Sequence, residues 1–416
     1  MVVERDVDLI VIGAGAAGMA AAAKARSLGI EKVLLVDDRI LVGGILPQCI
    51  HTGFGLHYFK EDLTGPEFAE RLYRKVLDSG AEVLLQSFAL SIEYRDVYDK
   101  KVKIVNSEGI HSIHAKAVIV ATGARERHVH EIGIVGDRPL AGVYTAGLVQ
   151  ALMDLYGVLP GREAVIIGSG DVGLIVARRL AMHGVKVKAV VEIMPWPGGL
   201  TRNIVQCLED WGIPLLLEHA VIRILGKQRV EKVVVAKVDK DLKPVPGSEK
   251  ELDCDTVIVA AGLRPDIDIL KSLGVSLDPA TGGPIVNEYL ETSMPGIFVA
   301  GNALVINDLV DTAAEQGELA AEGAKVFIEG KPPVKKRIPI IKDANVRLVV
   351  PQIIEGLREE ILIYGRVIKP VEKAVISFPE LELNFHTLRL LPAEMFKLRI
   401  KMSKSTIEKL DKITIT

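Results

Sequence analysis

The chain has 416 residues, which is too many for one hydrophobic core, so we expect two to four domains. Its apolar content of 49% and charged content of 25% are ordinary for a soluble globular protein, and a net charge of -3 gives no reason to expect nucleic-acid binding. Three scattered cysteines without a Cys-x-x-Cys pair argue against a disulfide scaffold, an iron–sulfur cluster or a metal site, and they suit the cytoplasm.

The first patterned segment predicts a strand–helix–strand unit over residues 8–12, 17–28 and 32–36. Its apolar run, residues 9–23, is interrupted by glycines, follows acidic residues and has no basic start. We therefore interpret it as neither a signal peptide nor a membrane anchor. A strand–helix–strand unit of this kind implies a parallel sheet.

A glycine-rich turn joins the first strand of this unit to its helix. Gly13 permits the tight turn, Gly15 lets the backbone approach a pyrophosphate, and Gly18 lets helix and strand pack closely. The helix N-terminus then offers free N–H groups to the phosphates. Asp37 ends the next strand, 37 − 13 = 24 residues on, where a carboxylate can accept both ribose hydroxyls. The adjacent Asp38 takes this place if the register shifts by one.

Between the two glycine-rich units, Thr64 and Glu67 have the spacing of a helix capping box. A second strand–helix–strand unit is then expected at 164–167, 173–183 and 186–191. Its turn repeats the glycine pattern, and Glu192 ends its second strand, 192 − 168 = 24 residues on. The identical spacing makes coincidence improbable. The glycines and neighbours expected to contact a nucleotide here are Gly168, Gly170, Asp171, Val172 and Gly173.

Glu192 bears on the choice between NAD and NADP. The 2′-phosphate of NADP places negative charge against this carboxylate, and two like charges about 4 Å apart cost about 4 kcal/mol at an effective dielectric near 20. The sequence therefore favours NAD. Lys186 and Lys188 lie on the same strand and weaken this preference if they face the site.

Three further buried strands end in small residues, at 116–120 before Ala121-Thr122-Gly123, at 256–259 before Ala260-Ala261-Gly262, and at 296–300 before Gly301-Asn302. A helix is expected from Thr312 to Phe327. Lys331-Pro332-Pro333 marks a boundary. The fold class is thus α/β, with two Rossmann-like parallel-sheet domains and a small, mainly β C-terminal domain.

The C-terminal part, residues 331–416, is predicted to hold short strands at 360–364, 395–400 and 412–415. It has about 17 Lys and Arg against about 10 Asp and Glu, while the rest of the chain is acidic. This surplus is either a solvated β surface or a docking face for an acidic partner.

The two glycine turns, together with residues 121–123 and 301–302, resemble those of the two-dinucleotide-fold flavoprotein superfamily, which includes thioredoxin and glutathione reductases. The resemblance covers about residues 6–328. It implies FAD on the first turn and NAD(H) on the second, with the NAD domain inserted into the FAD domain. The implied domains are 1–125 and 263–330 for FAD, 126–262 for NAD, and 331–416 as the C-terminal domain. FAD contacts are then expected from Gly13, Gly15, Ala16, Ala17, Gly18, Asp37, Asp38, Gly44, Ile45, Ala89, Ala121, Thr122, Gly123, Gly301, Asn302, Asp311 and Thr312, with Gly262 near the nicotinamide cofactor.

Three longer stretches, 43–57, 201–208 and 307–311, resemble one subgroup, the FAD/NAD oxidoreductase partner of flavin-dependent glycerol-3-phosphate dehydrogenases. Components of dye-linked proline dehydrogenases and amino-acid oxidase complexes are more distantly similar. The resemblance implies an oligomer in which a partner flavoprotein oxidises the organic substrate. Two residues depart from the superfamily pattern: Asn302 replaces an aspartate that holds a ribityl hydroxyl, and Ile175 replaces a glutamate that orients the nicotinamide end.

Candidates for chemistry near the flavin lie in the same first stretch. Cys49 has no second thiol nearby, so it is either a single redox thiol or a packing residue. His51, and less so His57, is expected to contact the flavin or to pass a proton. The helix near Asp311 and Thr312 is expected to point its N-terminus at reduced flavin, with one of the two as its cap.

The leading hypothesis is therefore an oxidoreductase that moves a hydride between NAD(H) and FAD and exchanges electrons with a partner flavoprotein. One alternative is a stand-alone NADH oxidase or a disulfide reductase that uses Cys49. Another is a non-catalytic scaffold that keeps its cofactors for stability.

Overall fold

The computed structural model describes residues 3–137, 140–330, 334, 336–343 and 345–416. The boundary expected at 331–333 lies outside the described residues. The chain forms two compact units: one contains the residues up to Ala124 and from Pro265 onward, and the other is Arg125–Arg264. The chain passes between the units through two paired strands, β9 (Ala124–Glu126) and β19 (Leu263–Pro265).

The first unit is built on a seven-stranded sheet in the order β5-β2-β1-β8-β7-β6, with β20 also paired to β8. Parallel pairing places the carboxyl ends of β1, β2 and β8 side by side, because Ile12 is in register with both Val36 and Val120. Residues buried on both faces, as in β2, are typical of parallel sheets. The strands are β1 (Val3–Ile12), β2 (Val33–Val36), β5 (Glu82–Leu84), β6 (Phe88–Asp96), β7 (Asp99–Asn106), β8 (Gly109–Val120) and β20 (Ile297–Val299).

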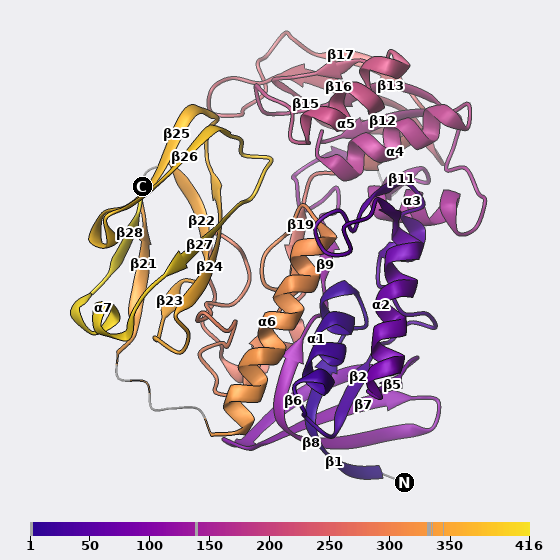
Figure 1. Ribbon diagram of the computed structural model, residues 1–416. Coiled ribbons are helices and arrows are strands. Elements are labelled where there is room, and N and C mark those ends of the chain that lie inside the picture. The colour runs from indigo at the N-terminus through magenta and orange to yellow at the C-terminus, as the bar shows by residue number, and fades with distance from the viewer. Residues whose placement is uncertain (1–2, 138–139, 331–333, 335, 344) are drawn as a thin grey trace. The chain divides into compact units, whose positions relative to one another are not determined.

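Three helices pack together in this unit, with α1 (Ala16–Ser27) between α2 (Gly65–Ser79) and α6 (Val310–Ile328) (Figure 1). The alanines of α1 allow close packing: a Cβ on Gly317 of α6 would lie 2.0 Å from the carbonyl oxygen of Ala17. The predicted capping box is confirmed, since Thr64 and Glu67 exchange hydrogen bonds at the start of α2. Shorter elements are η1 (Leu46–Gln48), β3 (Thr52–Phe54), β4 (Leu63–Thr64), η3 (Asp268–Leu273) and η4 (Gly301–Ala303).

The second unit contains a five-stranded parallel sheet in the order β11-β18-β12-β13-β14. Alternate residues of β12 enter different cores, Ala164 and Ile166 on one face and Val165 and Ile167 on the other, so the sheet is covered on both sides. A smaller sheet, β10-β15-β16-β17, also belongs to this unit. The elements are β10 (Val135–Gly136), β11 (Val143–Thr145), α3 (Ala146–Asp154), β12 (Glu163–Ile167), α4 (Asp171–Met182), β13 (Lys186–Val191), α5 (Thr201–Cys207), η2 (Glu209–Trp211), β14 (Leu215–Leu216), β15 (His219–Gly226), β16 (Val230–Lys237), β17 (Lys250–Asp253) and β18 (Thr256–Val259).

The C-terminal part is mainly β and is coloured yellow in Figure 1. It has a core of its own, and Leu348, Val350 and Tyr364 also join the core around the seven-stranded sheet, so this part belongs to the first unit. Its sheets are β23-β21-β28, β22-β24-β27 and β25-β26. The elements are β21 (Ile338–Lys342), β22 (Val346–Val350), β23 (Ile353–Ile354), β24 (Glu360–Val367), β25 (Val371–Phe378), η5 (Pro379–Leu381), β26 (Leu383–Leu390), β27 (Phe396–Lys401), α7 (Lys404–Lys409) and β28 (Ile413–Ile415).

The predicted fold class is confirmed: the chain is α/β, with two Rossmann-like parallel sheets and a mainly β C-terminal region. Among the described residues, no helix is long and apolar enough to cross a bilayer.

Candidate functional site

The first glycine turn fits closely between β1 and α1 except at its middle glycine. Gly13 has a φ of +106°, and a Cβ there would lie 2.3 Å from the carbonyl oxygen of Ala121. A Cβ on Gly18 would lie 1.7 Å from the carbonyl oxygen of Gly13. Gly15, by contrast, has no protein atom within 4 Å of its Cβ position. The outer glycines therefore serve the fold, while Gly15 leaves open space above the helix N-terminus.

The carboxylate of Asp37 is bound to this turn. It accepts hydrogen bonds from the backbone N–H of Ala14 at 2.6 Å and of Arg39 at 2.9 Å. Asp38 is exposed, and the Arg39 guanidinium donates to the Gly44 carbonyl oxygen at 2.7 Å. The structure thus places Asp37, rather than Asp38, against the glycine turn.

The second glycine turn repeats this geometry. Gly168 has a φ of +98°, and its Cβ would lie 2.4 Å from the carbonyl oxygen of Ala260. A Cβ on Gly173 would lie 2.8 Å from the Gly168 carbonyl oxygen, and Gly170 has open space where its Cβ would be. The two glycine turns therefore have the same backbone geometry, as their common spacing predicted.

Glu192 occupies the place in the second turn that Asp37 has in the first. Its buried carboxylate accepts the backbone N–H of Ser169 at 2.9 Å, the Ser169 hydroxyl at 2.6 Å and the backbone N–H of Met194 at 2.9 Å. Lys186 and Lys188 pair with Glu163, at 3.9 Å and 3.0 Å. These lysines are therefore engaged elsewhere and do not offset the charge of Glu192.

Both turns fit a dinucleotide. The open space over Gly15 and Gly170 lies where α1 and α4 begin, and unpaired N–H groups at a helix N-terminus bind phosphates. Asp37 and Glu192 stand at the adjacent strand ends, where riboses bind in such folds. Gly123 and Gly262 follow the neighbouring strands with positive φ and no atom within 4 Å of a Cβ position.

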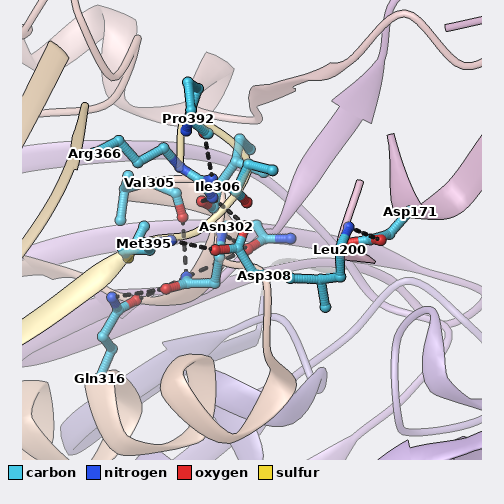
Figure 2. Close-up of polar contacts among 12 residues, drawn as sticks. Asp171, Leu200, Asn302, Val305, Ile306, Asp308, Gln316, Arg366, Pro392 and Met395 are labelled. Atoms are coloured by element: carbon cyan, nitrogen blue, oxygen red, sulfur yellow. Dashed lines mark hydrogen bonds and ion pairs between the residues drawn. The ribbon is translucent and has the colours of Figure 1, made fainter. Parts of the chain in front are cut away.

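Gly301 has a φ of +67°. A polar network that includes Asn302 and Gln316 organises the segment that follows it (Figure 2). Gln316, fully buried in α6, accepts the backbone N–H of Gly301 at 3.0 Å. The Oδ1 atom of Asn302 accepts the backbone N–H of Asn307 at 3.0 Å and its side-chain amide at 3.3 Å. Asn307 and Gln316 also exchange hydrogen bonds at 3.1 Å. These contacts use the Asn302 oxygen, so its side-chain amide is oriented with its N–H groups turned away from Asn307.

The predicted helix cap is wrong. Helix α6 begins at Val310, its N-cap residue is Leu309, and no side chain caps it. Asp311 lies inside the first turn and accepts the backbone N–H groups of Gly55, His57 and Tyr58 at 3.1, 2.9 and 2.7 Å. The reason is competition: the carboxylate satisfies three donors of a loop distant in sequence instead of the helix's own N–H groups. Thr312 lies one residue further into the helix.

Cys49 is buried at the end of η1, and its thiol donates to the carbonyl oxygen of Ile45 at 3.5 Å. Its carbonyl oxygen accepts the N–H of Gly65 at 2.8 Å, which ties it to the start of α2. Burial raises the pKa of Cys207 and raises the pKa of Cys254 to about 12, so both stay protonated at neutral pH, as packing thiols do.

Of the two candidate histidines, His57 lies in the loop that Asp311 organises, and His51 lies directly before β3. His51 is half-buried, with Nδ1 2.9 Å from the Thr52 carbonyl oxygen and its ring 5.1 Å from that of Phe54. His57 is exposed. The neighbouring Tyr58 donates its hydroxyl to Glu318, and burial together with this carboxylate raises the pKa of the phenol.

The segment after β13, residues 198–203, forms hydrogen bonds to the second glycine turn and to the start of α4. Asp171 accepts the backbone N–H of Leu200 at 2.8 Å (Figure 2) and the side-chain amide of Asn203 at 2.7 Å. Gly198 donates its N–H to the Ser169 hydroxyl at 2.7 Å. Ile175 packs against the core of this unit. The carboxylate of Asp171 is thus used to hold the turn, and Val172 is the exposed neighbour beside it.

The remaining predicted contacts are distributed around the first turn. Ala16 and Ala17 are buried in the first turn of α1, Ile45 is exposed, and the Thr122 hydroxyl donates to the Asp266 carbonyl oxygen at 2.5 Å. Ala89 pairs with Ile104 inside the sheet. Close to Ala89 in the chain, Gln86 and Ser87 donate their N–H groups to the carbonyl oxygens of Arg39 and Asp37.

The sequence interpretation also missed the partners of Asp308. Its carboxylate binds the guanidinium of Arg366 and accepts the backbone N–H of Met395 at 2.7 Å (Figure 2). Asp308 lies within a stretch already singled out, but no sequence signal links it to Arg366 in a distant strand.

Comparison with known proteins agrees with this geometry. Residues 7–317 match the family model described as pyridine nucleotide-disulphide oxidoreductase. The chain is 28% identical over 331 residues to thioredoxin reductase of Listeria monocytogenes, and the match covers 78% of this chain and 95% of that protein. It is also 28% identical over 344 residues to one of the subunits of opine oxidase from Agrobacterium tumefaciens, covering 76% of this chain and 65% of that one.

Among solved structures, thioredoxin reductase of T. acidophilum is similar, with a TM-score of 0.63 and 25% identity over 77% of this chain and 98% of that one. The matched family region ends before the C-terminal strands begin. With two glycine turns of one geometry and a family match over most of its length, the chain belongs to the pyridine nucleotide-disulphide oxidoreductase family, whose members are oxidoreductases that use FAD and NAD(P)H.

Proposed function

We propose that this protein is an NADH-dependent flavoprotein that works as one component of a larger complex. In that complex it exchanges electrons with a partner flavoprotein dehydrogenase, and the partner that we favour is a glycerol-3-phosphate dehydrogenase. The observation that carries the proposal is the repeated turn with its strand-end acid, Asp37 in one unit and Glu192 in the other. Two dinucleotides held in the same way on one chain suit hydride exchange between them. The resemblance of 43–57, 201–208 and 307–311 to the glycerol-3-phosphate dehydrogenase partner supports the choice of substrate class.

When bound, FAD and NAD(H) supply the hydride exchange between nicotinamide C4 and flavin N5. The chain's own part is placement: N–H groups at the starts of α1 and α4 bind phosphate, and the strand-end acids bind ribose hydroxyls. The network of Gly301, Asn302 and Gln316 fixes the donor for the ribityl chain. Catalysis then depends on how these residues orient two rings at near-attack distance.

The arrangement around Glu192 supports NADH over NADPH. Three hydrogen bonds fix its carboxylate where a 2′-phosphate would stand, and the nearest lysines of β13 pair with Glu163. The repulsion of two such charges, about 4 kcal/mol at about 4 Å, therefore has no cation of that strand to offset it.

The cysteines support an external electron acceptor or donor. Disulfide reductases need a redox thiol, but Cys207 and Cys254 have raised pKa values and Cys49 donates its thiol to a backbone carbonyl.

Exposed apolar side chains gather in the segment next to the first turn, among them Ile40 (70% exposed) and Leu41 (64% exposed). Such a segment suits contact with another protein.

The relatives support an assembly of more than one chain. The similar protein from Agrobacterium tumefaciens is named as part of an oxidase with subunits, which favours an oligomeric complex for this chain as well. We place that complex in the cytoplasm because Cys49, Cys207 and Cys254 form no disulfide among the described residues, as is usual where glutathione and thioredoxin keep cysteines reduced.

Anaerobic titration of the FAD-loaded protein with NADH tests the hydride step. We expect the oxidised-flavin absorbance to bleach, and to bleach at much lower concentrations of NADH than of NADPH. No bleaching with either nucleotide rejects the hydride step and favours a scaffold. The variant Cys49→Ser separates the rival disulfide reductase: unchanged flavin reduction and unchanged turnover with an artificial acceptor support our proposal, whereas lost turnover supports a thiol mechanism.

The partner is tested by purifying the protein from its native cells and identifying the chains that remain bound to it. We expect a second flavoprotein, and addition of its substrate should reduce the flavin of the complex. Recovery of a thioredoxin-like dithiol protein instead, with NADH-dependent disulfide reduction, would overturn the assignment.

A further inference from the structure

A buried arginine of the C-terminal strands reaches the segment of residues 301–309 that carries the candidate flavin contacts. Arg366, on β24, is 9% exposed. Its guanidinium donates to the carbonyl oxygens of Pro392 and Ala393, at 3.3 and 2.7 Å, and to that of Ile306 at 3.2 Å. It also pairs with the carboxylate of Asp308 (Figure 2). One side chain thus joins the C-terminal region to the 301–309 segment.

Both oxygens of Asp308 are used by the C-terminal region. Oδ1 binds Arg366 from β24, and Oδ2 accepts the N–H of Met395 from the turn before β27, at 2.7 Å. The Asp308 side chain is only 17% exposed. A partly buried carboxylate that binds two donors from another part of the chain, one on each oxygen, has one preferred position, because both contacts must be satisfied at once.

Asn307, the residue directly before Asp308 in the chain, transmits that position to Asn302. Asn307 donates its backbone N–H and its amide to the Asn302 oxygen, and exchanges hydrogen bonds with Gln316, which in turn accepts the N–H of Gly301. The path from Arg366 to the amide of Asn302 therefore consists of hydrogen bonds and one peptide link. In Figure 2, the labelled side chains of Arg366, Asp308 and Gln316 lie around the segment that carries Asn302.

A second set of contacts runs along α6, which starts directly after this segment. Lys397 of β27 pairs with Glu315, and Arg358 lies 3.5 Å from Glu322. These acids share a helix face with Asp311, whose carboxylate holds the loop of Gly55 to Tyr58. The C-terminal strands therefore contact the helix that organises both candidate flavin segments.

We propose that residues 334–416 serve to position the flavin, with Arg366 as the positioning residue that sets Asn302 through Asp308. This gives the C-terminal region a role in the FAD site rather than in binding an acidic partner. The inference rests on FAD occupying the first turn, as the proposed function requires. It explains why the charge of Arg366 is buried against the 301–309 segment while most basic residues of the C-terminal region are exposed.

The test compares Arg366→Ala, Arg366→Lys and Asp308→Asn with the control Arg399→Ala. Arg399 lies on β27 of the same sheet and pairs with Glu360 at 2.6 Å, but it is 61% exposed. Each deflavinated protein is titrated with FAD by fluorescence, and the flavin midpoint potential and visible circular dichroism are recorded. We expect Arg366→Ala and Asp308→Asn to weaken FAD binding about tenfold, as for residues coupled in one network, and to shift the potential.

The conservative Arg366→Lys should restore part of the affinity, and Arg399→Ala should stay within about twofold of the original protein because exposed pairs contribute little. Wild-type affinity and potential in both Arg366→Ala and Asp308→Asn overturn the proposal. If Arg366→Ala melts the apoprotein, Asp308→Asn decides, since it keeps the side-chain volume. Failure of NADH to bleach the flavin would reject the proposed function yet leave this comparison of FAD affinities valid.

Discussion

The carboxylate of Glu192 accepts the hydroxyl of Ser169 at 2.6 Å, a contact that Asp37 in the first turn lacks because Ala14 stands in the matching position. The second turn therefore holds its acid with three donors and the first with two. Apart from this hydroxyl, the two acids are bound by equivalent backbone groups. The difference makes the position of Glu192 the more rigid of the two, which bears directly on cofactor choice.

Replacing Glu192 by Gln should change the preference between nucleotides. The amide keeps the shape of the side chain but removes the charge that opposes a 2′-phosphate, so the ratio of KM for NADPH to KM for NADH should fall about tenfold or more. Initial rates of flavin reduction with each nucleotide measure this ratio. Glu163→Gln is the matched control, because Glu163 lies in the same unit and forms ion pairs with the lysines of β13. An unchanged ratio in Glu192→Gln would show that the acid does not discriminate.

The first glycine turn allows the fold and the cofactor to be separated. Gly15→Ala meets no protein atom within 4 Å and needs no unusual φ, so the apoprotein should melt at the original temperature while FAD binds at least about tenfold more weakly. Gly13→Ala places a Cβ 2.3 Å from the Ala121 carbonyl oxygen at a φ of +106°, and should destabilise the apoprotein itself. Thermal melts and FAD titrations of both variants provide the measurement; equal loss of stability in the two would contradict it.

Asp311 should be important for stability although it does not cap its helix. Its carboxylate satisfies the N–H groups of Gly55, His57 and Tyr58. Asp311→Ala leaves these donors without their acceptor, and the free energy of unfolding should fall by about 3 kcal/mol. Urea unfolding of the apoprotein measures the change. Asp38→Ala, at an exposed acid, should change it by less than about 0.5 kcal/mol. A small effect for Asp311→Ala would mean that the loop is held by other contacts.

Lys100 predicts a pH dependence at alkaline pH. Its fully buried ammonium donates to the Val97 and Lys116 carbonyl oxygens, and burial lowers its pKa from 10.5 to about 8, against the attraction of Glu291. Between pH 8 and pH 10.5 the unfolded chain then binds a proton that the folded chain has released. Stability from this group therefore rises with pH across that window, by at most about 1.4 kcal/mol per pH unit.

The variant Lys100→Met isolates this effect. The free energy of unfolding of the original protein, minus that of the variant, should increase between pH 8 and pH 10 in urea melts. The subtraction cancels groups common to both proteins, such as the buried tyrosines. A difference that stays level with pH would show that Lys100 keeps its proton in the folded state.

The sequence was sufficient for the local parts of the fold. Unbroken apolar runs predict the strands that end at residues 36, 120, 191 and 259. The steric demands on single glycines predict the helices that follow both glycine turns. The start of α6 was misplaced by two residues because Asp311 was assumed to satisfy its own helix. Its true partners are in a loop far away in sequence, which no local pattern reports.

The site was less predictable where contacts join distant segments. Arg366 and Asp308 lie on different elements with no common motif, and only their meeting in three dimensions makes either notable. Likewise, Gln86 and Ser87 donate their backbone N–H groups to the Asp37 segment, a contact between distant segments that no local pattern reports. Pattern and spacing identify the turns that hold nucleotides, whereas the residues that support those turns are set by packing.

The paired strands β9 and β19 give the inserted unit its entry and exit at one place. Neighbouring strands are about 5 Å apart, so excision of residues 127–262 would leave two ends that a short turn can close without disturbing the pairing around β1 and β8. A different nucleotide-binding domain whose two ends lie equally close together could be inserted between the same two strands. The pairing of β9 with β19 therefore makes residues 127–262 a segment that can be deleted or exchanged as one piece.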